Sequence, residues 1–319
     1  MEISKVTKNK EEGEREETIE EILAKLEKVK YPGSGNYYYF YQGFWISGFI
    51  LKGKLSLQTQ FVARDDDILL TSCPKSGSLW LKSLIFSIVK RNNDNNDLLS
   101  FSTSPHNLVR ALELSLPDEA KPRIMSAHSP YPSLPPSIMS SNCKIIYICR
   151  NPLDLFVSHW HFVHKLFGDI NTEPTHLEEC FDVFCKGIHS FGPFWDHILG
   201  FWKASLEMPH KILFLKYEEL KKDNVFFIRK IADFLGFPFS TEEENRGVPK
   251  QIEQLCSVEN MKKLDVTKTG KHYSGFPNSA FIRKGEVGDW VNYLTPEMAE
   301  RGKKLIQEKF AQSGLSFDF

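Results

Sequence analysis

Four short apolar runs recur along the chain, at residues 67–72, 123–127, 144–149 and 211–216. Within each run apolar residues are nearly continuous and do not alternate with polar ones. The segment after the first run spaces Trp80, Leu84 and Ile88 four residues apart, which is the period of one helix face. Apolar strands separated by helices are typical of a parallel sheet with helices on both faces. We therefore predict an α/β fold, formed as a single domain around a central parallel β-sheet.

The N-terminal part has a different pattern. Residues 1–17 are rich in Glu and Lys, so we expect a flexible charged extension, followed by one domain over residues 18–319. Apolar residues on one stripe predict an amphipathic helix over residues 18–28. The aromatic run at residues 36–45 has two interpretations, a packed cap or a wall that faces a ligand.

Composition narrows the class of protein. The 40 Lys+Arg against 41 Asp+Glu give a net charge of −1, which argues against binding a nucleic acid polymer. No secretory signal and no stretch of roughly 20 apolar residues is present, so we expect neither export nor a membrane partner. The six cysteines form no CxxC pair, which is typical of reduced thiols in a cytoplasmic protein.

Residues whose side chains can take part in binding or catalysis follow the four apolar runs. Lys75 lies three residues after the first run, and His128, Arg150 and Tyr217 come directly after the second, third and fourth run. Ligands of open parallel sheets bind at the carboxyl ends of the strands. We therefore expect these four side chains to meet at one site.

Three loops carry cations that are suited to anions. Residues 73–78 join a strand to a helix start, where free N–H groups, Lys75 and two serines can hold a phosphate, although the loop does not match G-x-x-x-x-G-K-[ST]. Arg150 precedes Asn151, a candidate helix cap, and residues 283–290 combine Arg283 and Lys284 with two glycines. Each loop alone is also compatible with an ordinary basic turn. Together they predict a ligand with more than one anionic group.

The set of motifs resembles the cytosolic sulfotransferase family, most closely its plant branch. The segments that carry the resemblance are residues 41–45, 73–82, 149–158, 191–195 and 283–290, in this order. The resemblance covers the chain from about Tyr41 to the C-terminus. It implies a single α/β domain with a fold like that of P-loop NTPases, and 3′-phosphoadenosine-5′-phosphosulfate (PAPS) as sulfuryl donor.

The same resemblance implies residue roles. The loop Lys75, Ser76, Gly77, Ser78, Leu79 and Trp80 would hold the phosphosulfate. The rest of the nucleotide would contact Arg150, Ser158, Tyr217, Arg283, Lys284 and Gly285, with Ser257 and Met261 as a further segment. Leu79 stands where the family usually has Thr, and Val258 where it commonly has Phe, so a phosphate contact and the adenine packing differ here. The dimerisation motif of animal relatives is incomplete around Thr295, so we expect a monomer and keep a dimer as the alternative.

A mechanism without metal follows from the resemblance. His128, matching the family's catalytic His, would take the proton from the acceptor hydroxyl, because an imidazole titrates near neutral pH. Lys75 would stabilise charge on the leaving group, and Ser158 would hold Lys75 back until the acceptor arrives. His159, His161 and His164 lack a further ligand at suitable spacing apart from Asp154, so we interpret them as ordinary helix or pocket residues.

Two other functions remain open at this point. A small-molecule kinase would share the sheet and phosphate loop but need ATP and Mg²⁺, and a catalytically silent nucleotide-binding protein would keep the loops without turnover. We expect the acceptor to be a small, largely apolar hydroxylated molecule that the sequence does not identify; the resemblance implies a flavonoid, a steroid or brassinosteroid, or a similar metabolite. Aromatic residues near the motifs are candidates for its wall, namely Trp45, Tyr131, Phe162 and Phe167.

Overall fold

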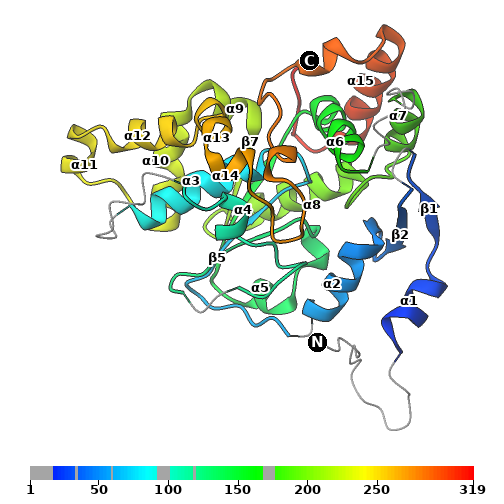
Figure 1. The fold of residues 1–319 in the computed structure, drawn as a ribbon, viewed down its shortest axis with the longest axis horizontal. Helices are drawn as coiled ribbons and strands as arrows, with labels where there is room; N and C mark the ends of the chain where they lie inside the picture. Colours follow the sequence, from blue (N-terminus) through cyan, green and yellow to red (C-terminus); the bar gives the residue numbers. More distant parts are fainter. Residues whose placement is uncertain (1–16, 33–34, 59, 92–100, 118–119, 168–176) are drawn as a thin grey trace.

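The structure is a computed structural model, which describes residues 17–32, 35–58, 60–91, 101–117, 120–167 and 177–319. Figure 1 shows the chain wrapped around a central sheet, with helices on both sides of it. Residues 1–16, and with them nearly all of the predicted charged extension, lie outside the described residues.

The central sheet has four parallel strands in the order β5-β4-β6-β7. The strands are β4 (Ile68–Thr71), β5 (Ile124–Ala127), β6 (Lys144–Cys149) and β7 (Ile212–Lys216). They coincide with the four apolar runs, so the predicted parallel sheet is confirmed. Because the strands are parallel, residues 72, 128, 150 and 217 all leave the sheet at the same edge.

Side chains of the strands point alternately to two hydrophobic cores, as the period of two requires. Leu69 and Tyr147 belong to one core, with α6 (Pro152–Phe167), α7 (Leu177–Cys185), α8 (Phe194–Glu207) and α15 (Pro296–Phe310). Leu70 and Ile146 belong to the other, with α3 (Ser78–Lys90), α10 (Asn224–Leu235) and α12 (Val248–Leu255). The predicted stripe Trp80, Leu84 and Ile88 is buried in this second core. Figure 1 shows the two groups of helices on opposite sides of the molecule.

The N-terminal part forms a small unit of its own. Thr18 caps α1 (Ile19–Lys25) in a capping box with Glu21. The helix ends earlier than predicted, because the chain turns into β1 (Lys28–Lys30) at the edge of an antiparallel sheet with β2 (Tyr37–Tyr41) and β3 (Phe44–Ser47). We did not predict this sheet. It includes most of the aromatic run, and α2 (Gly48–Gln58) follows it.

Short elements connect the main ones and complete the carboxyl edge. They are α4 (Pro105–Leu108), α5 (Pro136–Ser140), α9 (Tyr217–Lys222), α11 (Thr241–Asn245), α13 (Val258–Lys263), α14 (Asp265–Lys268) and the 3₁₀ turns Tyr131–Ser133, Asn278–Ala280 and Asp289–Asn292. Within the described ranges, no helix is both long and apolar enough to cross a bilayer.

Candidate active site

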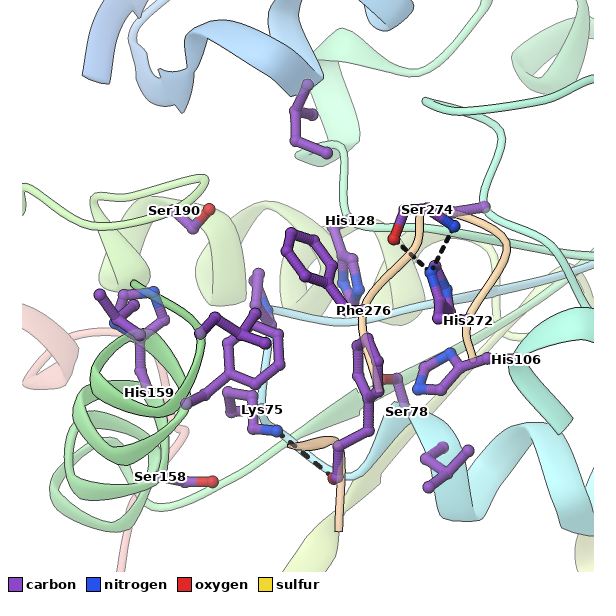
Figure 2. A pocket seen from close by; sticks show the side chains of 18 of the residues that line it. Lys75, Ser78, His106, His128, Ser158, His159, Ser190, His272, Ser274 and Phe276 are labelled. Carbon is purple, nitrogen blue, oxygen red and sulfur yellow. Dashed lines mark hydrogen bonds between the residues drawn. The ribbon is translucent and has the colours of Figure 1, made fainter. Parts of the chain in front are cut away.

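A cavity of about 670 Å³ opens at the carboxyl edge of the central sheet. Lys75, His128, Arg150 and Tyr217 all line it, so the four strand ends converge as predicted. Figure 2 shows Lys75, His128 and Ser158 around one space, with Lys75 and Ser158 at one end of it.

The loop after β4 has the backbone of an anion cradle. Lys75 and Gly77 both have positive φ values, 71° and 103°. A Cβ at Gly77 would lie 2.7 Å from Cδ2 of Tyr217, so glycine is required both for its conformation and for its close approach. Ser78 begins α3, and the N–H groups of its first turn have no carbonyl acceptor within the helix. Free N–H groups at a helix start are the arrangement with which proteins bind phosphate and other anions.

The Lys75 ammonium is held by a backbone oxygen and two rings. Its Nζ lies 3.4 Å from the carbonyl oxygen of Phe281 and 4.2 Å from the centroid of the Phe162 ring. Burial, together with the nearby charges of Arg150, Arg283 and Lys165, lowers the pKa of Lys75 to about 7. An anionic ligand would reverse this effect, because it would stabilise the protonated form.

Arg150 keeps one buried donor unused. Its guanidinium donates to the carbonyl of Glu286 at 2.6 Å and lies 3.5 Å from the carboxylate of Asp154. Its Nε has no partner among the described residues. Asn151 Oδ1 accepts the N–H of Leu153 at 2.9 Å, which confirms Asn151 as the cap of α6. The cap ends the strand abruptly and leaves Arg150 at the cavity.

The third cationic loop is fastened by two buried carboxylates. Asp154 accepts the N–H groups of Gly288 at 2.7 Å and Trp290 at 3.0 Å. Asp289 binds both Arg283 and Lys284. Burial opposes the ionisation of Asp289, but hydrogen bonds from Lys284, Asn292 and Arg283 outweigh it and lower its pKa to about 2.

Arg283 lines the cavity and has one N–H donor, on Nε, without a hydrogen-bond partner among the described residues. In the part of the chain that the structure describes, its buried Nε has no partner, like that of Arg150. The hydroxyl of Tyr217 donates to the carbonyl oxygen of Gly285 at 2.9 Å, which joins this loop to the start of α9, directly after β7. A Cβ on Gly285 would lie 2.6 Å from Val258, so the loop packs directly on the start of α13.

His128 is held with one ring nitrogen available. Its Nδ1 lies 2.8 Å from the carbonyl oxygen of Ser72. A carbonyl only accepts, so Nδ1 carries the proton and Nε2 keeps its lone pair. Burial lowers the pKa of His128, while Glu113 and the Ser72 carbonyl oppose that shift. The imidazole is therefore neutral near pH 7, as a general base must be.

Residues that the sequence analysis did not select support His128. Glu113 Oε1 accepts the N–H of His128 and of Ser129, each at 2.7 Å. His197 Nε2 lies 2.9 Å from the carbonyl oxygen of His128, and its Nδ1 lies 2.9 Å from the hydroxyl of Tyr147. No motif or period marks either residue: Glu113 lies in an irregular segment 15 residues before His128, and His197 lies on α8, 69 residues after it.

Most predicted nucleotide contacts line the cavity, but several side chains do not. Ser76 is fully buried and does not line the cavity, and the Lys284 ammonium is bound to Asp289. Val258 and Met261 line the cavity, whereas Ser257 caps α13 through the N–H of Asn260. Ser158 lines the cavity, yet Lys75 bonds the Phe281 carbonyl instead of Ser158.

The wall candidates divide in the same way. Phe162 and Phe167 line the cavity together with Tyr37, Tyr38 and Tyr39 from the aromatic run. Trp45 lies elsewhere, because its backbone pairs with Gly192 and its ring packs on Phe40. Tyr131 packs against Phe201 in the core. The aromatic run therefore forms one β-hairpin, in which Tyr37, Tyr38 and Tyr39 of β2 line the cavity and Trp45 of β3 does not.

The histidines of α6 are dispersed by the helix. His159 is buried, and burial lowers its pKa to about 3, while His161 and His164 lie around Trp160. No group of three or more His, Cys, Asp or Glu side chains suited to a metal ion occurs within the described ranges.

Comparison with known proteins gives a consistent result. Residues 65–314 match the family described as sulfotransferase domain. The chain is 43% identical over 288 residues to a flavonol 3-sulfotransferase of Flaveria bidentis, covering 87% of this chain and 92% of that protein. Its fold is similar to that of an Arabidopsis thaliana protein provisionally assigned as a steroid sulphotransferase, with TM-score 0.72, 37% identity and coverage of 93% and 94%. It is also similar to a mouse sulfotransferase complexed with PAP, with TM-score 0.67, 30% identity and coverage of 86% and 95%.

Proposed function

The chain belongs to the sulfotransferase family, and we propose that it moves the sulfuryl group of PAPS to a hydroxyl of a small, largely apolar molecule. The observation that supports this proposal most is the placement of His128. An imidazole with its Nδ1 proton bound to Ser72 lines the same cavity as Lys75. A base and a cation at one cavity are what in-line transfer to a hydroxyl needs.

The donor site fits a small polyanion. Arg150 Nε and Arg283 Nε are buried donors without a partner in the described ranges, and the start of α3 presents further N–H groups. A related mouse sulfotransferase was crystallised with PAP, the desulfated nucleotide. We assign the phosphosulfate to the loop from Lys75 to Trp80, and the second phosphate to Arg150, Ser158 and Arg283.

The chemistry of the site rests on two side chains. When bound, PAPS supplies an activated sulfuryl group. We assign to Lys75, which lines the same cavity, the stabilisation of the negative charge on the departing oxygen. His128 accepts the proton of the acceptor hydroxyl at Nε2, and the resulting positive charge is stabilised by the nearby carboxylate of Glu113. The site needs no metal for these roles.

The acceptor part of the cavity is mainly aromatic. Tyr37, Tyr39, Phe162, Phe167 and Phe276 line it, which favours a flat or ring-containing molecule. The names of two relatives, one for flavonols and one for steroids, fit acceptors of this size and polarity.

Two measurements test the proposal. Calorimetric titration should show binding of PAP to the purified chain, with much weaker binding of ATP and Mg²⁺. Transfer of labelled sulfate from PAPS to a panel of phenols and hydroxysteroids should then be detected. His128→Gln should bind PAP normally and lose roughly 100-fold or more in turnover, the usual contribution of a general base.

His210→Gln is the matched control, because His210 is exposed on the surface, away from the cavity. Its turnover should equal that of the wild type. Normal turnover by His128→Gln would contradict the assignment of the base. PAP binding without transfer to any acceptor would instead indicate a silent nucleotide-binding protein.

A further inference from the structure

A second buried lysine lines the cavity without an ion-pair partner. Lys82 lies one helical turn after Ser78 on α3, and only 2% of its surface is exposed. Its Nζ lies 3.0 Å from Nδ1 of His106. Among the described residues, no carboxylate lies within ion-pair distance of this Nζ. Burying an ammonium without a neighbouring anion is energetically costly, so an anionic ligand next to Lys82 would be stabilising.

The nearest influential carboxylate does not supply that anion. Glu113 raises the pKa of Lys82, but burial outweighs it and lowers the pKa to about 7. Glu113 also acts on a second buried ammonium, Lys54, and its Oε1 already accepts three hydrogen bonds from His128 and Ser129. One carboxylate thus acts on two buried lysines, so positive charge is in excess whenever both lysines are protonated.

Two histidines beside Lys82 present donors as well. An ammonium only donates, so His106 Nδ1 accepts from Lys82 and its proton lies on Nε2. The N–H of Ser274 donates to His272 Nδ1 at 3.1 Å, so the proton of His272 also lies on Nε2. The two rings are 5.3 Å apart, and Figure 2 shows them side by side on the cavity wall.

The polar groups that line the cavity around Lys82 therefore all carry hydrogen-bond donors. Lys82, His106 and His272 line the cavity and offer N–H donors, and no Asp or Glu is among the described residues that line it. The proposed donor site has its own cations in Lys75, Arg150 and Arg283. Lys82 and His128 line the same cavity, and the charge of Lys82 contributes to the lowered pKa of His128, so the ammonium and the proposed base share one site.

We propose that Lys82, with His106 and His272, binds a carboxylate of the acceptor, so that the preferred acceptors are hydroxylated carboxylic acids with an apolar or aromatic body. The inference rests on the proposed function, since it names the substrate class of the same cavity. A carboxylate would accept from all three groups and neutralise the buried charge of Lys82. The aromatic wall would bind the body of the acid while its hydroxyl faces His128.

The test compares the affinity of the protein for a carboxylic acid with its affinity for the uncharged methyl ester of that acid. Binding of para-hydroxyphenylpropanoic acid and of its methyl ester to the PAP-loaded protein is measured by calorimetry at about pH 6.5, where the acid is ionised. The wild type should bind the acid about tenfold more tightly than the ester, the worth of a charge-assisted contact. Lys82→Met should abolish that preference, and Lys82→Arg should retain part of it.

Lys90→Met is the matched control, because Lys90 lies at the end of the same helix and does not line the cavity. It should keep the full preference for the acid. Equal binding of acid and ester by the wild type overturns the inference, and this comparison does not depend on any variant folding. An equal loss of PAP affinity and acid affinity in Lys82→Met also overturns it, because Lys82 would then belong to the donor site.

The two proposals fail in different measurements. If no labelled sulfate reaches any compound of the acceptor panel, including this acid and its ester, the proposed function fails, while the binding comparison still decides the carboxylate site. If sulfate is transferred to acid and ester with the same kcat/KM by the wild type, the proposed function stands and the carboxylate site is overturned.

Discussion

Glu113 accepts the backbone N–H of His128 at 2.7 Å, so a buried carboxylate holds the residue that we propose as the general base. The same oxygen accepts the N–H and the hydroxyl of Ser129, at 2.7 and 2.8 Å. Glu113 therefore fixes the turn after β5 and at the same time raises the pKa of His128. It is a positioning residue, because it acts through His128.

The first prediction concerns the charge of Glu113. Glu113→Gln retains an oxygen for the three hydrogen bonds but removes the charge that raises the pKa of His128. A base is active when unprotonated, so the fall of kcat/KM at acidic pH should move to lower pH in this variant. The pH profile of sulfate transfer measures this shift. Glu259→Gln, an exposed change on α13, should leave the profile unchanged, and an unmoved profile in Glu113→Gln would refute the role.

The second prediction concerns proton uptake by Lys75. Its pKa of about 7 in the free protein means that it is mostly neutral at about pH 8, whereas a bound phosphate favours the ammonium form. PAP binding at that pH should therefore take up a proton, and the affinity should fall as the pH rises above about 7. The phosphates themselves contribute little there, because their second pKa is about 6.

Calorimetry in buffers of different ionisation enthalpy measures this uptake. Lys75→Met should weaken PAP binding and abolish most of the uptake. Lys186→Met, a change at an exposed lysine just after α7, should alter neither. Uptake that persists in Lys75→Met would show that another group titrates.

The third prediction concerns Leu79, which stands where the family usually has Thr. Its side chain lines the cavity in the first turn of α3, beside the proposed phosphate position. Leu79→Thr should tighten PAP binding by roughly fivefold, corresponding to one added hydrogen bond of about 1 kcal/mol. Leu79→Val has the shape of Thr without its hydroxyl and should give no such gain. If both variants bind PAP equally, the backbone already satisfies the phosphate.

The fourth prediction concerns the fastening of the third loop. Asp154 is buried, accepts the N–H groups of Gly288 and Trp290, and lies 3.5 Å from Arg150. Asp154→Ala should lower the free energy of unfolding by about 3–5 kcal/mol, because it leaves a buried charge and two N–H groups unpaired. Denaturant unfolding measures the loss.

The exposed Glu300 on α15 provides the comparison for this prediction. Glu300→Ala should change the free energy of unfolding by less than about 0.5 kcal/mol. Asp154→Ala should also weaken PAP binding, since the loop carries Arg283. Unaltered stability of Asp154→Ala would mean that water replaces the carboxylate.

Much of the site was predictable because it depends on chain order alone. The residues after four parallel strands, among them Lys75 and Arg150, must emerge at one edge whatever the details of packing. The supporting residues could not be predicted. Glu113 lies in an irregular segment between α4 and β5, and His197 on α8 is 69 residues away from the carbonyl that it binds. Neither carries a periodic signal, since each contact arises from packing.

The aromatic run at residues 36–45 also shows the difference between what composition predicts and what packing decides. Its composition was compatible with a packed cap or with a wall that faces a ligand, but it did not show that Tyr37, Tyr38 and Tyr39 line the cavity while the backbone of Trp45 pairs with Gly192. The two-residue turn at Gln42 and Gly43, both with positive φ, folds the run into a hairpin and separates its halves.

The sequence by itself determined the parallel sheet, the edge at which the site lies and the cationic loops, because strand periodicity and loop composition are local properties. Tertiary structure alone decided which nitrogen of His128 is available, which donors of Arg150 and Arg283 remain unpaired, and that Lys82 lies buried beside His106. These properties depend on contacts between distant segments, and each depends on whether a hydrogen-bond partner lies within about 3 Å.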